Sequence, residues 1–217
     1  MNQQNTIDQT IDFVKTTLEG AEGGHDWWHI YRVWQLSKRI ASTEKVDLFI
    51  VELGALLHDI ADIKFHDGDE TVGPQKARKF LKTVGVEESV ILHVENIINN
   101  ISFGGGNNKQ NFSSPELSVI QDADRLDALG AIGIARTFNY GGFKNREMYN
   151  PSIQPNLNMT KEEYRKSTAP TINHFYEKLL LLKDRMNSVT GKKMAEHRHL
   201  FIEQFLAEFY AEWEGDK

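Results

Sequence analysis

Apolar residues in this sequence recur at intervals of three and four positions, and sustained alternation of apolar and polar residues is hard to find. The three- and four-residue interval places side chains on one face of an α-helix, whereas a half-buried strand needs strict alternation. Ile7, Ile11, Val14 and Leu18 show this interval near the start of the chain. The sequence therefore predicts an all-α fold.

Glycines, prolines and breaks in the apolar pattern divide the chain into expected helices and loops. We expect helices over residues 7–18, 28–41, 47–60, 70–84, 87–100, 117–124 and 129–138, followed by a hairpin of two long helices over 171–186 and 193–213. Residues 102–114 and 139–159 are expected to be loops, and the first is a candidate lid. Its three successive glycines do not predict a P-loop, because no Gly-Lys-Ser/Thr follows them.

The size and charge of the chain restrict its class. Its 217 residues suit one domain, with a core over about 25–140 and a C-terminal helical elaboration over about 160–215. A net charge of −6 disfavours polymeric nucleic acid as a partner. Without a signal-peptide pattern or a membrane-length apolar run, the expected location is the cytoplasm. Exposed apolar surface on the C-terminal hairpin could support a homodimer.

His58 and Asp59 are neighbours within a strongly apolar stretch, residues 51–62. Burying two adjacent ionisable groups requires a compensating partner, and a bound metal ion is the partner that fits best. The chain contains no cysteine, so its metal ligands must be imidazoles and carboxylates. His29 lies upstream, and three acids compete for the remaining position downstream. These acids are Asp122, Asp124 and Asp127.

A set of two histidines and two carboxylates suits Mn, Fe, Zn, Ni or Mg better than calcium. Such an ion lowers the pKa of a bound water and offsets charge on a phosphoryl oxygen, so hydrolysis of an anionic ester is the reaction class that the set favours. Asp62 lies one helical turn beyond His58 and could position or deprotonate a water. Several basic side chains could bind phosphate, although two of them, Arg32 and Arg125, could equally be ion-pair partners of nearby acids. The four are Arg32, Lys64, Arg125 and Arg136.

Two other histidines have alternative interpretations. His25 and His29 are spaced as a helical zinc pair, but the sequence between them lacks the glutamate of the H-E-x-x-H pattern. His25 is therefore better interpreted as a substrate contact or as a residue that supports a ligand. His93, on the face of an expected helix with Ile97, could be either a core histidine or part of the site.

Three segments, residues 29–33, 55–62 and 122–128, resemble the HD-domain metal-dependent phosphohydrolase superfamily in order and spacing. Within it, the chain is similar to the small bacterial, cytoplasmic HD hydrolases through residues 24–29, 101–103, 133–138 and 140–142 and through its closing helices. The resemblance covers nearly the whole chain. It implies a single helical HD-domain bundle with a C-terminal helical hairpin.

The resemblance also implies a ligand set, which is His29, His58, Asp59 and Asp124. In the family, the acid three residues after the His-Asp pair often positions the nucleophile, and Asp62 occupies that position here. Members with two metals add further histidines, for which this chain offers only His66 and His93. One divalent ion is therefore expected. The family implies Mn²⁺, with Mg²⁺, Fe²⁺, Ni²⁺ and Zn²⁺ as alternatives.

The function implied by the resemblance is hydrolysis of a nucleotide, with (deoxy)nucleoside triphosphates as the expected substrates and pyrophosphate as a product. Within enzymes, the alternative is a 5′-nucleotidase or another phosphomonoesterase or phosphodiesterase. The alternative from another class is a nucleotide-binding regulatory module without turnover. The candidate substrate contacts are His25, Lys64, His93, Arg136 and Tyr140.

Overall fold

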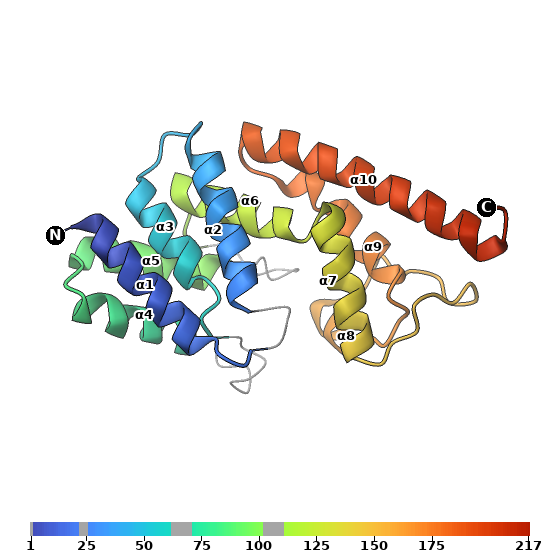
Figure 1. The fold of residues 1–217 in the computed structure, drawn as a ribbon, viewed down its shortest axis with the longest axis horizontal. Coiled ribbons are helices and arrows are strands. Elements are labelled where there is room, and N and C mark those ends of the chain that lie inside the picture. Colours follow the sequence, from blue (N-terminus) through green and yellow to red (C-terminus); the bar gives the residue numbers. More distant parts are fainter. Residues whose placement is uncertain (1, 22–25, 62–70, 102–110) are drawn as a thin grey trace. The chain divides into compact units, whose positions relative to one another are not determined.

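The computed structural model describes residues 2–21, 26–61, 71–101 and 111–217. These residues form α-helices and short 3-10 turns and no strand, which confirms the predicted all-α fold. They fall into two compact units, residues 1–123 and 124–217, and each is described by itself (Figure 1). None of the helices in these ranges is long and apolar enough to cross a membrane. The candidate lid over 102–114 lies largely outside the described residues.

The helices of the first unit begin where the sequence supplies a capping side chain. Asn2 and Asp47 each accept hydrogen bonds from two main-chain N–H groups, at the starts of α1 and α3, and Asp26 accepts one at the start of α2. Such caps satisfy donors that a helix start leaves without a helical partner. The helices are α1 (Gln3–Thr17), α2 (Trp27–Ala41), α3 (Leu48–Leu57), α4 (Val72–Thr83), α5 (Glu88–Asn100) and the larger part of α6 (Pro115–Asp127).

Helix α3 is the most deeply buried element of this unit. It packs against α1, α2 and α5 (Figure 1), and eight of its ten residues are buried. Gly54 permits close approach on one face, because a Cβ there would lie 2.7 Å from Ile120 of α6 and 3.2 Å from Ile97 of α5. An apolar helix that packs against neighbours on several sides fixes the position of the residues that follow its last turn. His58 and Asp59 follow directly.

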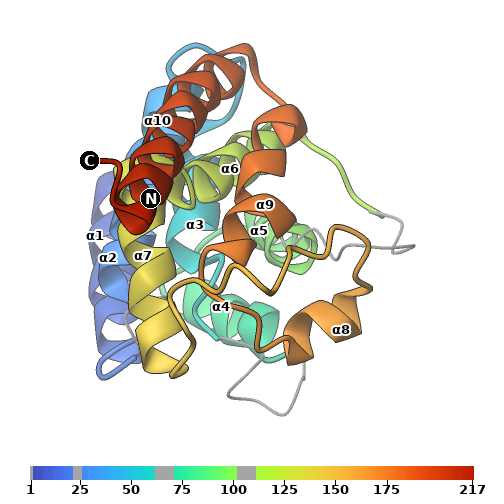
Figure 2. The ribbon, with the colours of Figure 1, turned by 90° about the vertical axis from the view of Figure 1, so that its right-hand side faces the viewer.

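The second unit contains the end of α6 and four further α-helices, with α10 packed against α7. Helix α10 begins at the capping residue Ser188 and ends at Gly215, whose left-handed conformation (φ 77°) suits a glycine. Aromatic rings of Phe138, Phe175 and Phe205 pack together in this unit, with centroids 5.8–6.0 Å apart. The helices are α7 (Gly130–Phe143), α8 (Lys161–Lys166), α9 (Asn173–Glu177) and α10 (Val189–Glu214) (Figure 2).

The expected long helix over 171–186 is instead α9 followed by two 3-10 turns, Leu179–Leu181 and Lys183–Arg185. The α-helix ends at Lys178, whose backbone (φ −142°, ψ −57°) is not helical. Leu179 and Leu182 are both buried, and a 3-10 turn brings residues three apart onto one side. The two 3-10 turns therefore keep both leucines on the buried side of the chain.

Helix α8 was not among the expected helices, and it begins just after the segment 139–159 that was expected to be a loop. Its start is nevertheless readable in the sequence. Thr160 and Glu163 form a capping box, in which each side chain bonds to the other residue's main-chain N–H. The segment 139–159 is also shorter than expected as a loop, because α7 extends to Phe143.

Candidate metal centre

His29 reaches the interior of the first unit through the first turn of α2. The Asp26 carboxylate caps this helix by accepting a hydrogen bond from the His29 main-chain N–H at 2.9 Å. The cap fixes the residue at which α2 begins and therefore the face of the helix on which His29 lies. His29 is 2% exposed and lies among the buried residues Ile30 and Val33 of the same helix.

His58 and Asp59 follow the last residue of α3. His58 is 7% exposed, and its Nδ1 lies 2.8 Å from the main-chain oxygen of Ala55. A carbonyl oxygen can only accept, so Nδ1 carries the hydrogen. This is the tautomer that leaves Nε2 as the nitrogen for a metal, with the other nitrogen oriented by a main-chain carbonyl.

His29, His58 and Asp59 converge. One possible ligand atom from each lies within 4.8 Å of the others, and the two imidazole rings meet edge to face with centroids 5.4 Å apart. Ligand atoms that each lie about 2.0–2.2 Å from one ion are separated by at most about 4.4 Å, so modest side-chain rotation would bring these three onto a divalent ion. The negative end of the α3 dipole also favours a cation here. The donor set fits the ion that the sequence predicted.

Asp124, the predicted fourth ligand, lies on the last turn of α6 and belongs to the second unit, where it is half-buried. Its two competitors are more deeply buried. Asp122 is fully buried, and Asp127 is 1% exposed and forms an ion pair with Arg136 at 2.8 Å. Asp127 is therefore occupied by a cation of the protein itself, and Asp124 stays the predicted ligand.

Several predicted positions lie outside the described residues. They include the predicted catalytic residue, two candidate substrate contacts and one histidine considered for a second metal. These are Asp62, His25, Lys64 and His66.

His93 of α5 contacts two residues at the start of α6. Its Nε2 lies 3.0 Å from the Ser114 hydroxyl and 3.4 Å from the Glu116 carboxylate. The hydroxyl of Ser114 also accepts the Leu117 main-chain N–H, and Glu116 accepts that of Asp47. His93 thus links α5 to the start of α6. Its proposed contact with substrate stays a prediction.

The remaining candidate substrate contacts, Arg136 and Tyr140, lie on α7. Arg136 donates to the carboxylate and to the main-chain oxygen of Asp127, at 2.8 and 3.4 Å. The Tyr140 ring has the Arg146 guanidinium 5.6 Å and the Lys144 ammonium 5.7 Å from its centroid. Both residues thus lie beside charged groups of the second unit.

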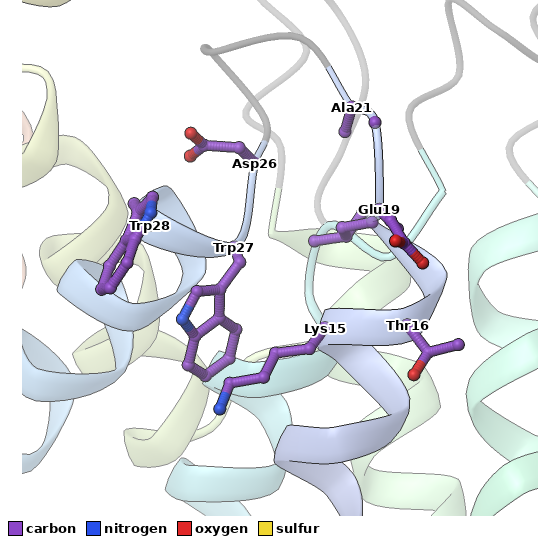
Figure 3. A pocket seen from close by; sticks show the side chains of 9 residues that line it. Lys15, Thr16, Glu19, Ala21, Asp26, Trp27 and Trp28 are labelled. Carbon is purple, nitrogen blue, oxygen red and sulfur yellow. The ribbon is translucent and has the colours of Figure 1, made fainter.

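The first unit also has a hollow of about 490 Å³ between the end of α1 and the start of α2 (Figure 3). The Lys15 ammonium lies 5.0 Å from the Trp27 ring centroid on its floor, and the neighbouring Trp28 is 61% exposed. Sequence reasoning did not identify this hollow, because no short-range pattern joins Lys15 to Trp27.

Sequence reasoning also missed Arg198 of α10. Its guanidinium donates to the main-chain oxygen of Leu126, two residues after Asp124. The two partners are 72 positions apart in the chain, and no motif connects them.

Comparison with known proteins places these features in a family. Residues 27–129 match the HD domain family, a segment that includes all four predicted metal ligands. The chain is 37% identical over 209 residues to the uncharacterized protein YpgQ of Bacillus subtilis, covering 95% of this chain and 93% of YpgQ.

Solved structures agree with this match. An HD-superfamily hydrolase of Bacillus thuringiensis is 45% identical, with a TM-score of 0.78 over 99% of this chain and all of that one. Bacillus subtilis YpgQ in complex with ADP is 34% identical, with a TM-score of 0.76 over 97% of this chain and all of that one.

Proposed function

This chain belongs to the HD-domain family of metal-dependent hydrolases, and from that premise we propose that it hydrolyses nucleotides, with (deoxy)nucleoside triphosphates as substrates and pyrophosphate as a product. The observation that carries the proposal is the convergence of His29, His58 and Asp59 within 4.8 Å. The ADP complex of the relative YpgQ supports a nucleotide as the ligand. We propose Mn²⁺ as the ion, a cytoplasmic location and the capacity to form a homodimer.

We propose that His29, His58, Asp59 and Asp124 hold one divalent ion. When bound, the ion would supply positive charge to a phosphate oxygen and acidify a water. The protein's own contribution is orientation. The Ala55 carbonyl holds the His58 ring in its binding tautomer, and the buried surroundings of His29 and His58 limit competing water.

In the proposed reaction, the water oxygen attacks the α-phosphorus in line, and the bond from that phosphorus to the α–β bridging oxygen breaks. Asp62 orients the water and accepts its proton, and pyrophosphate leaves. Lys64 and Arg136 neutralise the leaving group, and His25, His93 and Tyr140 contact the substrate. Because Arg136 also pairs with Asp127, its share of this neutralisation is expected to be smaller than that of Lys64.

Product analysis tests the proposal. Purified protein is incubated with Mn²⁺ and a panel of nucleoside and deoxynucleoside mono- and triphosphates, and Asp59→Ala is the blank. Monophosphate and pyrophosphate formed from triphosphates, and absent with Asp59→Ala, are the expected result.

Other products would redirect the assignment. Nucleoside released from monophosphates would replace the proposal with a 5′-nucleotidase, and turnover of other esters with another phosphomonoesterase or phosphodiesterase. Nucleotide binding without any turnover would identify a regulatory module.

A further inference from the structure

The last turn of α6 ends in carbonyl groups that have no partner within the helix. Arg198 of α10 donates to the Leu126 oxygen, and Arg136 of α7 donates to the Asp127 oxygen at 3.4 Å. Both donors carry positive charge at the negative end of the helix dipole, where a cation is favoured. Two guanidinium groups from other helices therefore cap the turn that contains Asp124.

The Asp127 side chain strengthens this cap. It is 1% exposed and accepts from Arg136 at 2.8 Å. Burial lowers the pKa of Arg198, and the charge of Asp127 opposes that change. Asp127 is thus a buried carboxylate that attracts both arginines to the end of α6.

Gly130, between α6 and the body of α7, leaves room for Arg198. Its backbone is left-handed (φ 71°), and a Cβ there would lie 3.1–3.5 Å from three carbons of the Arg198 side chain. A larger residue would therefore be strained and would press on Arg198. Arg125, next to Asp124, also donates to the Arg185 oxygen at 2.6 Å, so the turn is held from three directions.

We propose that Arg198 and Arg136 are positioning residues, which hold the last turn of α6 so that the Asp124 carboxylate is oriented for the metal ion. This inference rests on the proposed function, in which Asp124 is the fourth ligand. Both arginines lie outside residues 27–129, the segment that matches the HD domain family. That segment alone therefore contains the ligands but not the groups that cap the last of them.

The consequence is measurable in metal affinity. Removing a group that orients a metal ligand typically lowers affinity about 10- to 100-fold, because the ligand must be ordered when the ion binds. Arg198→Met keeps most of the aliphatic length and removes the guanidinium. We expect the Kd for Mn²⁺ of the full chain, measured by electron paramagnetic resonance of free Mn²⁺, to rise by about that factor.

Two further variants separate positioning from packing. Arg198→Lys keeps a positive donor and is expected to recover part of the affinity. Arg146→Met is the matched control, because Arg146 also donates to a main-chain oxygen of the second unit, that of Ser167 at 2.6 Å, but not to α6. Its Mn²⁺ affinity is expected to equal that of the wild type.

An Arg198→Met protein that is folded by circular dichroism and binds Mn²⁺ as the wild type does would overturn the inference. If that variant does not fold, Arg136→Met is measured in its place, without substrate, and the same result would overturn it.

Wild type, Asp59→Ala and Asp124→Ala distinguish this failure from failure of the proposed function. A wild type that neither binds Mn²⁺ nor hydrolyses nucleotides removes both proposals. Loss of binding in Asp59→Ala, with wild-type affinity in both arginine variants, removes only this inference. Wild-type affinity in Asp124→Ala would remove this inference and also remove Asp124 from the proposed ligand set.

Discussion

The two units of the protein treat their buried and half-buried ionisable groups differently. In residues 1–123, His29, His58 and Asp59 direct ligand atoms toward one another. In residues 124–217, the buried Asp127 faces an arginine, and His174 lies 2.6 Å from the Tyr164 hydroxyl. Burial alone therefore does not distinguish a metal ligand from a structural residue. The two are distinguished by the chemistry of the group that faces the ionisable side chain.

His174 shows how a half-buried histidine is satisfied without an ion. Burial, assisted by the charges of Lys178 and Arg146, lowers its pKa to about 3. Burial also raises the pKa of the Tyr164 hydroxyl, which stays protonated and forms a hydrogen bond with His174 Nδ1. The pair is neutral and complete, so no cation is needed there.

The largest expected effect separates the histidines of the two units. His29→Ala should abolish Mn²⁺ binding and lower kcat/KM by on the order of a thousandfold, because a catalytic ion supplies several kcal/mol of transition-state stabilisation. His174→Ala should leave Mn²⁺ binding intact. Isothermal titration with Mn²⁺ and initial rates measure both. Loss of Mn²⁺ binding in His174→Ala as well would contradict the distinction between a metal-binding histidine in the first unit and a structural one in the second.

The next effect concerns the buried ion pair of the second unit. Arg136→Met should destabilise the fold by about 3 kcal/mol, because Asp127 is left buried and charged. Arg78→Met provides the control, since Arg78 pairs with the exposed Glu88 and the half-buried Glu95, and its loss should therefore destabilise the fold less than Arg136→Met does. Urea unfolding measures both variants. Equal losses would mean that burial does not set the strength of these pairs.

A pH titration tests the neutral His174 pair. The pKa of His174 is about 3 when folded and about 6.5 when unfolded, so between these values the unfolded chain binds more protons and stability falls as the pH falls. Between pH 6.5 and 4.5 this group should remove about 2–3 kcal/mol of the free energy of unfolding.

His174→Gln provides the comparison for this titration. The variant should lose less stability than the wild type over the same pH interval, by about the amount above. Parallel pH profiles of the two proteins in urea unfolding would show that His174 titrates normally.

The smallest expected effects distinguish two glycines of the second unit. Gly130→Ala should cost about 1–2 kcal/mol, because its φ of 71° is unfavourable for alanine. Gly142→Ala should gain about 0.5 kcal/mol, because Gly142 is helical and a Cβ there meets nothing within 4 Å. Thermal unfolding compares them. If Gly130→Ala leaves stability unchanged, the backbone between α6 and α7 can adjust to alanine at little energetic cost.

The features that local sequence could predict are those determined by near neighbours. His58 and Asp59 stand out within an apolar run, and capping aspartates determine the starts of α2 and α3. The three converging donors were all among the predicted ligands. Thr160 and Glu163 carried an equally local signal for α8, which was overlooked.

Features that depend on distant partners could not be predicted. The bond of Arg198 to the Leu126 oxygen joins residues 72 positions apart, and a lone arginine on an amphipathic helix has no distinguishing pattern. The expected helix 171–186 is divided into α9 and two 3-10 turns, and this division depends on the distant residues against which Leu179 and Leu182 are buried. Helical spacing alone is compatible with either outcome.

The bond from His58 Nδ1 to the Ala55 carbonyl has a kinetic consequence. A free imidazole exchanges its proton between two nitrogens, and an arriving ion meets the wrong tautomer part of the time. Here the last turn of α3 keeps the proton on one nitrogen before any ion arrives. Capture of the ion by this ring therefore does not require the proton to move from one nitrogen to the other.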